Sequence, residues 1–232
     1  MHHPNFPRRQ AGFTLIEIAI VLVIIGLLLG GILKGQELIN SARVKNLATD
    51  FRNIPLFIYG YQDRFRALPG DDPAVVAHLG VAGVQATTPA GSQGNATIDG
   101  NWNSVTPTDE SYLFWQHVRL AGLAPGSTNT AVAADYLPRN ATGGSIGIQS
   151  GTNAAATAPI QSAGAGIRGA YVICSEGILG NFVLQLDTQM DDGETDAGSM
   201  MATPTTGYVI GADATATADI DPALTYTVCL GV

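Results

Sequence analysis

The sequence predicts an α+β protein, in which a long hydrophobic N-terminal helix, partly transmembrane, packs on a small C-terminal antiparallel β-sheet. Three observations lead to this prediction. Residues 13–33 form an unbroken apolar run, and residues 44–68 carry apolar side chains at a helical spacing. The last third of the chain contains short β-branched and aromatic segments separated by Gly, Asp and Pro.

The composition is that of a folded protein with little charged surface. Of 232 residues, 46% are hydrophobic and 13% are charged, which excludes a highly charged disordered chain. The formal net charge of -8 is unevenly distributed. Residues 34–66 carry six basic and three acidic side chains, whereas residues 67–232 carry three basic and 15 acidic ones. A basic rod therefore precedes an acidic head, and because an acidic surface repels phosphate, we expect no nucleic-acid partner.

The apolar run at residues 13–33 is long enough to cross a membrane, since a helix of this length extends about 30 Å, the thickness of a bilayer's hydrocarbon core. Arg8 and Arg9 precede it, and no acid lies in the first twelve residues. The positive-inside rule therefore places the N-terminus in the cytoplasm and the head beyond the inner membrane. A secretory signal peptide is the alternative, but its small-residue cleavage site would follow the apolar run. Here the small residues Ala11 and Gly12 precede the run.

The residues at the start of the run form a specific pattern. A basic leader is followed by Gly12, by Phe13-Thr14-Leu15-Ile16-Glu17 and then by the apolar helix. In this order the chain resembles the class III leader of type IV prepilins and of type II secretion pseudopilins. The resemblance implies that residues 1–12 are a leader peptide. A prepilin peptidase/methyltransferase would cut between Gly12 and Phe13 and methylate the new amino group of Phe13.

The resemblance also implies a role for Glu17, the one ionisable side chain in the apolar run. A carboxylate in a membrane helix is costly and is normally kept for a partner. In the family this carboxylate is thought to pair with the N-terminal amine of a neighbouring subunit, so Glu17 would set the axial register of a filament. Many type IV pilins carry a proline in the apolar segment, whereas here the first proline after the leader is Pro55. Glycines such as Gly26 and Gly30 would then supply any weakness in the helix.

Residues 34–68 are expected to continue the helix as an amphipathic spine. Apolar side chains recur at alternating intervals of three and four residues, as on a helix with one narrow apolar face: Val44, Leu47, Phe51, Ile54, Ile58, Tyr61, Phe65 and Leu68. This face would either form a coiled-coil seam with another chain or, as the resemblance implies, pack on the protein's own sheet. We expect Pro55 to kink the helix, because proline lacks an amide donor, and Pro69-Gly70 to end it.

Residues 69–232 are expected to form a globular head in the periplasm or outside the cell. Two stretches rich in Gly and Ala, residues 81–101 and 140–169, predict long surface loops. Residues 111–120 predict a short helix, on which we interpret His117 as a residue of the polar face. Four segments predict strands of an antiparallel sheet: residues 170–174, 181–187, 207–210 and 224–230.

The two cysteines lie on two of these predicted strands. In an oxidising compartment Cys174 and Cys229 would form a disulfide, and pilins often hold their C-terminal region in this way. Closing a loop of this length would stabilise the head by about 4 kcal/mol on the chain-entropy model. Two buried free thiols are the alternative.

An acidic segment near the C-terminus suggests either a bound cation or a solvated turn. Residues 187–196 contain four aspartates and Glu194, and hard oxygen ligands on a tight turn are what calcium requires. The spacing does not match an EF-hand, although some pseudopilins hold calcium in a loop near their C-terminal strands. Two interpretations remain open: an acidic turn around Asp192-Gly193, or a calcium site formed by Asp187, Asp191, Asp192 and Asp196.

No catalytic motif accompanies these features. Residues 164–169 spell G-x-G-x-x-G, but they precede a predicted strand instead of following one, so they do not fit a dinucleotide site. The chain contains no Walker motif, no H-E-x-x-H and no G-x-S-x-G. We therefore expect a protein that is not an enzyme and that has no cofactor, with only calcium in the acidic segment left open.

Together these observations predict a structural subunit of a type IV pilus-like filament. The resemblance implies storage in the bacterial inner membrane, with a cytoplasmic N-terminus and a periplasmic head. An inner-membrane assembly platform would then bring the chain into a helical filament with copies of itself or other pilins. A type II secretion pseudopilin is one alternative. The other, from a different class, is a membrane-anchored periplasmic binding module or enzyme.

Overall fold

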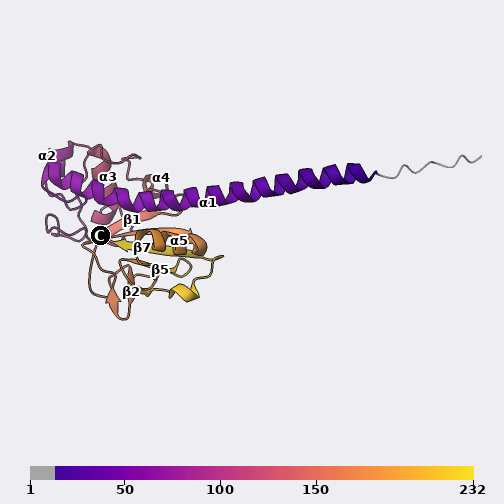
Figure 1. The fold of residues 1–232 in the computed structure, drawn as a ribbon. Helices are drawn as coiled ribbons and strands as arrows, with labels where there is room; N and C mark the ends of the chain where they lie inside the picture. Colours follow the sequence, from indigo (N-terminus) through magenta and orange to yellow (C-terminus); the bar gives the residue numbers. More distant parts are fainter. Residues whose placement is uncertain (1–13) are drawn as a thin grey trace, which may run out of the picture. The chain divides into compact units, whose positions relative to one another are not determined.

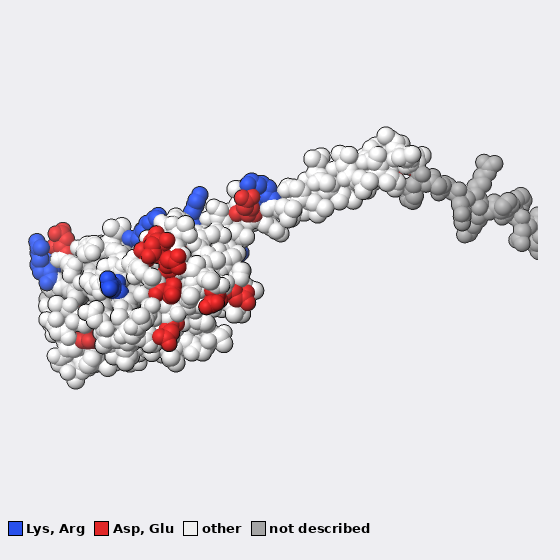
Figure 2. All heavy atoms as spheres, turned by 60° about the horizontal axis from the view of Figure 1, so that its bottom comes forward, with Lys and Arg blue, Asp and Glu red and all other residues white. Residues whose placement is uncertain are grey.

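The computed structural model describes residues 14–232, and the chain divides into an N-terminal unit, residues 1–42, and a C-terminal unit, residues 43–232. Helix α1 (Leu15–Phe65) contributes to both units (Figure 1). In the N-terminal unit its apolar side chains are exposed along its whole length, from Leu15 at 90% to Leu33 at 67%. Figure 2 accordingly shows most of this part of the helix in white.

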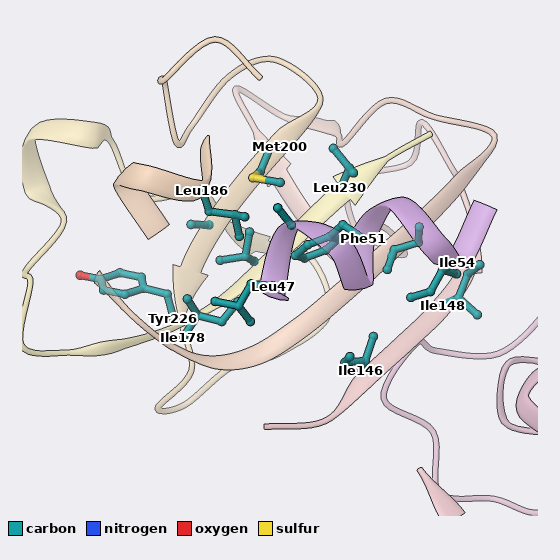
Figure 3. Close-up of a cluster of buried hydrophobic side chains, with 14 of the residues drawn as sticks. Leu47, Phe51, Ile54, Ile146, Ile148, Ile178, Leu186, Met200, Tyr226 and Leu230 are labelled. Atoms are coloured by element: carbon teal, nitrogen blue, oxygen red, sulfur yellow. The ribbon is translucent and has the colours of Figure 1, made fainter. Parts of the chain in front are cut away.

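In the C-terminal unit, α1 buries the face that the sequence pattern predicts. Every position of the three-and-four spacing from Val44 to Tyr61 is buried, and Leu47 and Ile58 are completely so. Figure 3 shows Leu47, Phe51 and Ile54 lying among side chains of the sheet and of a second helix. The spine therefore packs on the protein's own head, as the second of the two readings of its apolar face requires.

The end of α1 differs slightly from the expectation. The helix ends at Phe65, three residues before Leu68, because Arg66 adopts a left-handed conformation with φ 56°. Such a residue cannot continue a right-handed helix. Pro55 lies inside α1, and the helix continues on both sides of it.

The main sheet has four strands in the order β1-β4-β7-β5, and all neighbouring pairs are antiparallel. Its strands are β1 (Ile146–Ser150), β4 (Tyr171–Leu179), β5 (Met200–Pro204) and β7 (Thr225–Gly231). Side chains alternate between its faces, as the period of a strand requires. Ile173 and Val228 face the core shared with α1, whereas Cys174 and Cys229 belong to a second cluster on the other face.

Helices cover one face of this sheet and a small sheet covers the other (Figure 1). Beside the α1 spine lie α3 (Glu110–Leu120) and α5 (Gly180–Met190), which contribute Phe114 and Phe182 to the first cluster. The small sheet has the order β3-β2-β6. The remaining elements are short: α2 (Val75–Leu79), α4 (Ala133–Tyr136), β2 (Ile160–Ser162), β3 (Ala165–Gly166), β6 (Ala212–Asp213) and the 3-10 helix η1 (Thr217–Asp219).

The predicted α+β class, with a long N-terminal helix on a small antiparallel sheet, is confirmed. Several details of the head were wrong. Residues 181–187 are helical, within α5, because Phe182, Val183 and Leu186 share one helix face against the sheet. Residues 207–210 form no strand, and the stretch 140–169, expected as a loop, contains β1, β2 and β3. The predicted helix at residues 111–120 is confirmed as α3.

Candidate functional site

The proposed processing site, between Gly12 and Phe13, lies outside the described residues, which begin at Thr14. Glu17, the residue expected to take part in filament assembly, lies within the described residues. Its Oε2 accepts hydrogen bonds from the backbone N–H of Thr14 at 2.7 Å and from the Thr14 hydroxyl at 2.8 Å. In return, the Glu17 N–H donates to Thr14 Oγ1 at 3.3 Å.

This reciprocal pair is a capping box at the first turn of α1. Thr14 is the residue before the helix and Glu17 is its third residue, so the two side chains satisfy backbone N–H groups that the helix itself leaves unpaired. The T-x-x-E spacing was visible in the sequence, but the sequence analysis assigned Glu17 only to assembly. The carboxylate thus already has a structural partner within its own chain.

Beyond Glu17, α1 presents an apolar surface that nothing in the described chain covers. It is the one helix within residues 14–232 that is long and apolar enough to cross a membrane, with a mean hydropathy of 2.9 over its most apolar window. Leu22, Leu27 and Leu29 are each more than half exposed. Because burying one such side chain is worth about 2 kcal/mol, this surface fits a membrane anchor or a packed helical assembly.

The acidic segment after α5 brings three of its four predicted aspartates together. Ligand oxygens of Asp187, Asp191 and Asp192 all lie within 4.8 Å of one another, and Asp196 is not part of this group. Asp191 is fixed by the backbone N–H groups of Ser199 at 2.6 Å and Met200 at 2.8 Å. Figure 2 shows acidic side chains, in red, gathered on one face of the head.

Asp187 is the unusual member of this group. Its side chain is buried, with 1% of its surface exposed. Oδ1 accepts a hydrogen bond from the Gly193 N–H at 2.8 Å, whereas Oδ2 is buried without any partner in the described chain. Burial, together with the charges of Asp191 and Asp192, raises the pKa of Asp187 to about 6. A buried carboxylate oxygen without a donor is costly.

Gly198 allows the carboxylates to approach each other this closely. It adopts φ 69°, and a Cβ at this position would collide with the carboxylate of Asp191 and lie 2.9 Å from Oδ2 of Asp192. Only glycine leaves room for two carboxylates here and accepts this conformation without strain. Gly198 thus leaves room for the carboxylates of Asp191 and Asp192, and a hard cation such as calcium would neutralise the negative charge of the group.

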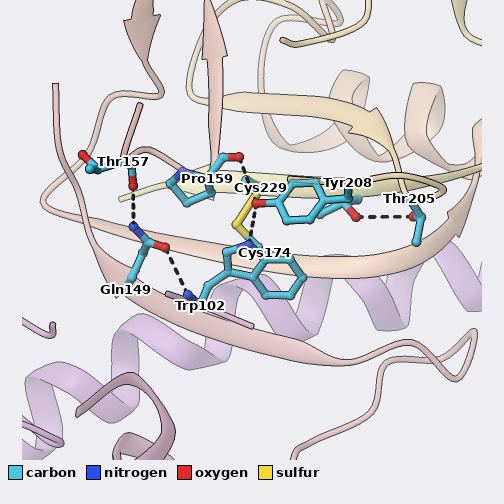
Figure 4. Close-up of a disulfide and its surroundings, with 9 residues drawn as sticks. Trp102, Gln149, Thr157, Pro159, Cys174, Thr205, Tyr208 and Cys229 are labelled. Atoms are coloured by element: carbon cyan, nitrogen blue, oxygen red, sulfur yellow. Dashed lines mark hydrogen bonds between the residues drawn. A yellow bond between two sulfur atoms is a disulfide. The ribbon is translucent and has the colours of Figure 1, made fainter. Parts of the chain in front are cut away.

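Cys174 and Cys229 form a disulfide between directly opposed residues of β4 and β7 (Figure 4). Both residues are completely buried. Beside the disulfide, the Trp102 indole N–H donates to Tyr208 Oη at 2.7 Å, and the Tyr208 hydroxyl donates to the Pro159 carbonyl at 2.9 Å. This arrangement joins the loops before α3, before β2 and after β5 beside the strand pair that carries the disulfide.

A buried polar network, which the sequence analysis missed, fixes the end of α1. Asp72 accepts hydrogen bonds from the Tyr61 hydroxyl at 2.7 Å and from the Ala74 N–H at 2.9 Å, and its Oδ2 lies 2.7 Å from His78 Nδ1. Burial opposes ionisation of Asp72, but the hydrogen bonds from His78, Tyr61 and Ala74 outweigh it and hold its pKa below the usual range. A pocket of about 490 Å³ borders the network. None of the described residues that line it is Ser, Thr or Cys, the residue types whose hydroxyl or thiol groups serve as nucleophiles.

His117 belongs to the same end of the molecule and is completely buried, so its interpretation as a residue of the polar helix face was wrong. Its Nδ1 accepts a hydrogen bond from the Gly70 N–H at 2.9 Å, and Nε2 lies 2.8 Å from the Val84 carbonyl oxygen. Burial lowers the pKa of His117. The ring therefore connects α3 to the turn after α1 as a neutral group, with both nitrogens occupied.

The comparison with protein families gives a match at the N-terminal end of the chain. Residues 7–33 match the family model for the prokaryotic N-terminal methylation motif. The segment is a type IV prepilin-like class III signal peptide. The N-terminal methylation motif is that of a structural, pilin-type family, and it supports a type IV pilin or pseudopilin without distinguishing the two. No curated protein and no solved structure matches the chain.

Proposed function

We propose that this protein is a structural subunit of a type IV pilus-like filament, assembled through its N-terminal helix. The observation that carries the proposal is the N-terminal methylation motif at residues 7–33, which includes the exposed apolar part of α1. A prepilin peptidase/methyltransferase would cleave the chain between Gly12 and Phe13 and methylate Phe13. The chain would wait in the inner membrane with its head in the periplasm and then enter the filament through the assembly platform.

In this proposal Glu17 pairs with the methylated amine of a neighbouring subunit. Two opposite charges attract strongly in a low-dielectric helix bundle, and one left alone there is costly. The amine would join the two Thr14 donors that already hold Oε2 of Glu17. The joint between subunits would therefore form on a carboxylate whose orientation is fixed beforehand.

The first test is the intact mass and N-terminal sequence of the protein from its native envelope. We expect a chain that begins at methylated Phe13. A Gly12→Leu variant should remain uncleaved, whereas Ala11→Ser should be processed normally. A chain that still begins at Met1, in cells where the peptidase processes other substrates, would overturn the filament proposal and favour a membrane-anchored periplasmic module.

A type II secretion pseudopilin is the alternative within the same class. The two roles differ in where the assembled protein is found and in what its loss prevents. Deletion of a pilus subunit should remove filaments that can be sheared from the cell surface. Deletion of a pseudopilin should instead leave folded exoproteins trapped in the periplasm. A Glu17→Ala variant should be cleaved but not assembled in either case.

We further propose that Asp187, Asp191 and Asp192 hold a calcium ion that stabilises the head. Two observations support this: Asp187 Oδ2 is buried without a hydrogen-bond donor in the described chain, and a carboxylate oxygen of Asp187 lies within 4.8 Å of oxygens of Asp191 and Asp192. Calcium chloride at millimolar concentration should raise the melting temperature of the protein by several degrees. The shift should disappear in Asp187→Asn and persist in Asp213→Asn, which removes an exposed acid outside the group. An unchanged melting temperature of the wild-type protein would overturn this proposal.

A further inference from the structure

Asp50 on the α1 spine is a half-buried carboxylate without a partner. The ion pairs among residues 14–232 are Lys34 with Glu37 and His78 with Asp72, so Asp50 takes part in neither. Burial raises its pKa to about 6, and no hydrogen-bond donor or cation in the described chain lowers it. A half-buried carboxylate without a cation in its own subunit would be stabilised by a cation that a neighbouring molecule supplies at an interface.

Asp50 borders a pocket of about 220 Å³ between the spine and the head, entirely within the C-terminal unit. Much of the wall is apolar and comes from Ile54, Phe57, Pro125, Pro138 and Ile146. Two guanidinium groups also line it. That of Arg119 donates to the carbonyls of Pro125, Ser127 and Tyr136, and that of Arg139 donates to the carbonyl of Gly143. Neither guanidinium forms an ion pair with Asp50, so the Asp50 carboxylate is free to pair with a cation from another molecule.

The same flank of the spine carries a suitable cation. Arg43 lies seven residues before Asp50, is exposed, and has no ion-pair or hydrogen-bond partner within residues 14–232. Seven residues are close to two helical turns, so Arg43 and Asp50 point to the same side and are separated by about 10.5 Å along the axis. Phe57 follows after another seven residues. This flank therefore presents a cation, an anion and an aromatic ring at equal intervals.

We propose that Arg43 of one copy enters the Asp50 pocket of a second copy and pairs with its carboxylate. The aliphatic part of the arginine would lie against Phe57 and the prolines, while the guanidinium meets Asp50. Two parallel spines offset by seven residues satisfy this contact. The contact joins two different residues of the same flank, and it leaves a free Arg43 in one copy and a free Asp50 in the other. These free residues can pair with further copies when this flank of each spine faces a common axis, so the contact need not close on two copies.

This inference rests on the proposed filament function and is tested by exchanging the charges. Asp50→Arg and Arg43→Asp should each reduce the yield of sheared filaments at least tenfold. The double variant, which restores the pair in reversed order, should recover it. Arg52→Asp is the matched control, because Arg52 is also an exposed cation of the spine but lies about 200° around the helix from Asp50. Melting temperatures of the purified variants show whether each one folds.

A second measurement does not require the protein to fold and assemble with the charges of Arg43 and Asp50 reversed. Chains with Arg43→Cys and chains with Asp50→Cys, expressed together, should form a disulfide-linked dimer, and neither variant should do so alone. The native cysteines do not interfere, because Cys174 and Cys229 are bonded to each other. If wild-type filaments form but the double variant is not rescued and no mixed dimer appears, the inference is wrong while the filament function stands. A wild-type chain that forms no filament would overturn both.

Discussion

At the scale of single residues, two carboxylates of the C-terminal unit are buried without the hydrogen bonds or cations that would compensate for their burial. Asp187 has one oxygen without a donor, and Asp50 has no partner at all in the described chain. For each of them burial raises the pKa to about 6. Acids in this state cost the isolated subunit stability when they ionise, and cations from outside can recover that cost.

The raised pKa of Asp187 predicts an unusual pH dependence. Between about pH 4 and pH 6 the folded protein holds a proton on Asp187 that the unfolded chain has already lost, so the unfolding free energy should fall as the pH rises. In calcium-free buffer, Asp187→Asn should flatten this fall, because asparagine has no charge to bury. Some slope should remain from Asp50, which titrates in the same direction.

Urea denaturation at a series of pH values measures this slope. Asp213→Asn serves as the control, because it removes an exposed acid. A slope in Asp187→Asn that equals the wild-type slope would show that the carboxylate of Asp187 ionises without cost in the folded protein.

At the scale of elements, the α1 spine contributes the central side chains of the head core (Figure 3). Phe51 is 2% exposed, and truncating a buried phenylalanine to alanine typically costs about 3–5 kcal/mol. Phe51→Ala should therefore reduce the unfolding free energy by about that amount. Leu56→Ala, at a position 63% exposed on the same helix, should change it by less than about 0.5 kcal/mol. Equal losses in the two variants, measured by urea denaturation, would contradict the packing described.

The disulfide joins two neighbouring strands of the main sheet, and the cysteines are 55 residues apart in the sequence. Removing it with Cys174→Ala and Cys229→Ala together should lower the unfolding free energy by about 4 kcal/mol, because the unfolded chain gains the entropy of an open loop. The comparison is best made in the oxidised wild type and the double variant, by denaturant unfolding. No loss would mean that strand pairing alone already holds this part of the head.

The sequence predicted the elements that bury one regular stripe and failed where the pattern was ambiguous. The spine was recognised because its stripe persists over several turns and faces a single core. Residues 181–187 hold four apolar side chains in a short run that suits either a strand or a helix, and packing against the sheet decides for α5. Strand β1 was missed because its IGIQS sequence lies inside a glycine-rich stretch.

Candidate sites that are local in sequence could be predicted, whereas those formed only by the fold could not. The leader pattern around Gly12 and Glu17 is local in sequence and could be recognised directly, and the acidic loop is a contiguous segment. The polar network of Tyr61, Asp72 and His78 depends on how the chain turns back after α1, which no spacing reveals. The unpaired state of Asp50 is a property of the folded surface and likewise has no sequence signal.

At the scale of the whole molecule, the two units have different requirements. The core clusters lie within residues 43–232, whereas residues 14–42, the described part of the N-terminal unit, bury no large apolar side chain. A fragment containing residues 43–232, exported to the periplasm, should therefore fold, form its disulfide and remain soluble. The full chain should require detergent. Circular dichroism, thiol titration and size exclusion chromatography of the fragment test this, and an aggregated fragment with free thiols would contradict it.

The capping box at the start of α1 has a consequence for how easily a filament could be taken apart. Oε2 of Glu17 is held by Thr14 in the single chain, before any neighbour is present. When a subunit leaves, the carboxylate would lose the amine but keep both Thr14 donors, so it would not be stranded without a bond. The Thr14 hydrogen bonds would therefore lower the cost of opening this joint, which would suit a filament that is extended and withdrawn many times with the same subunits.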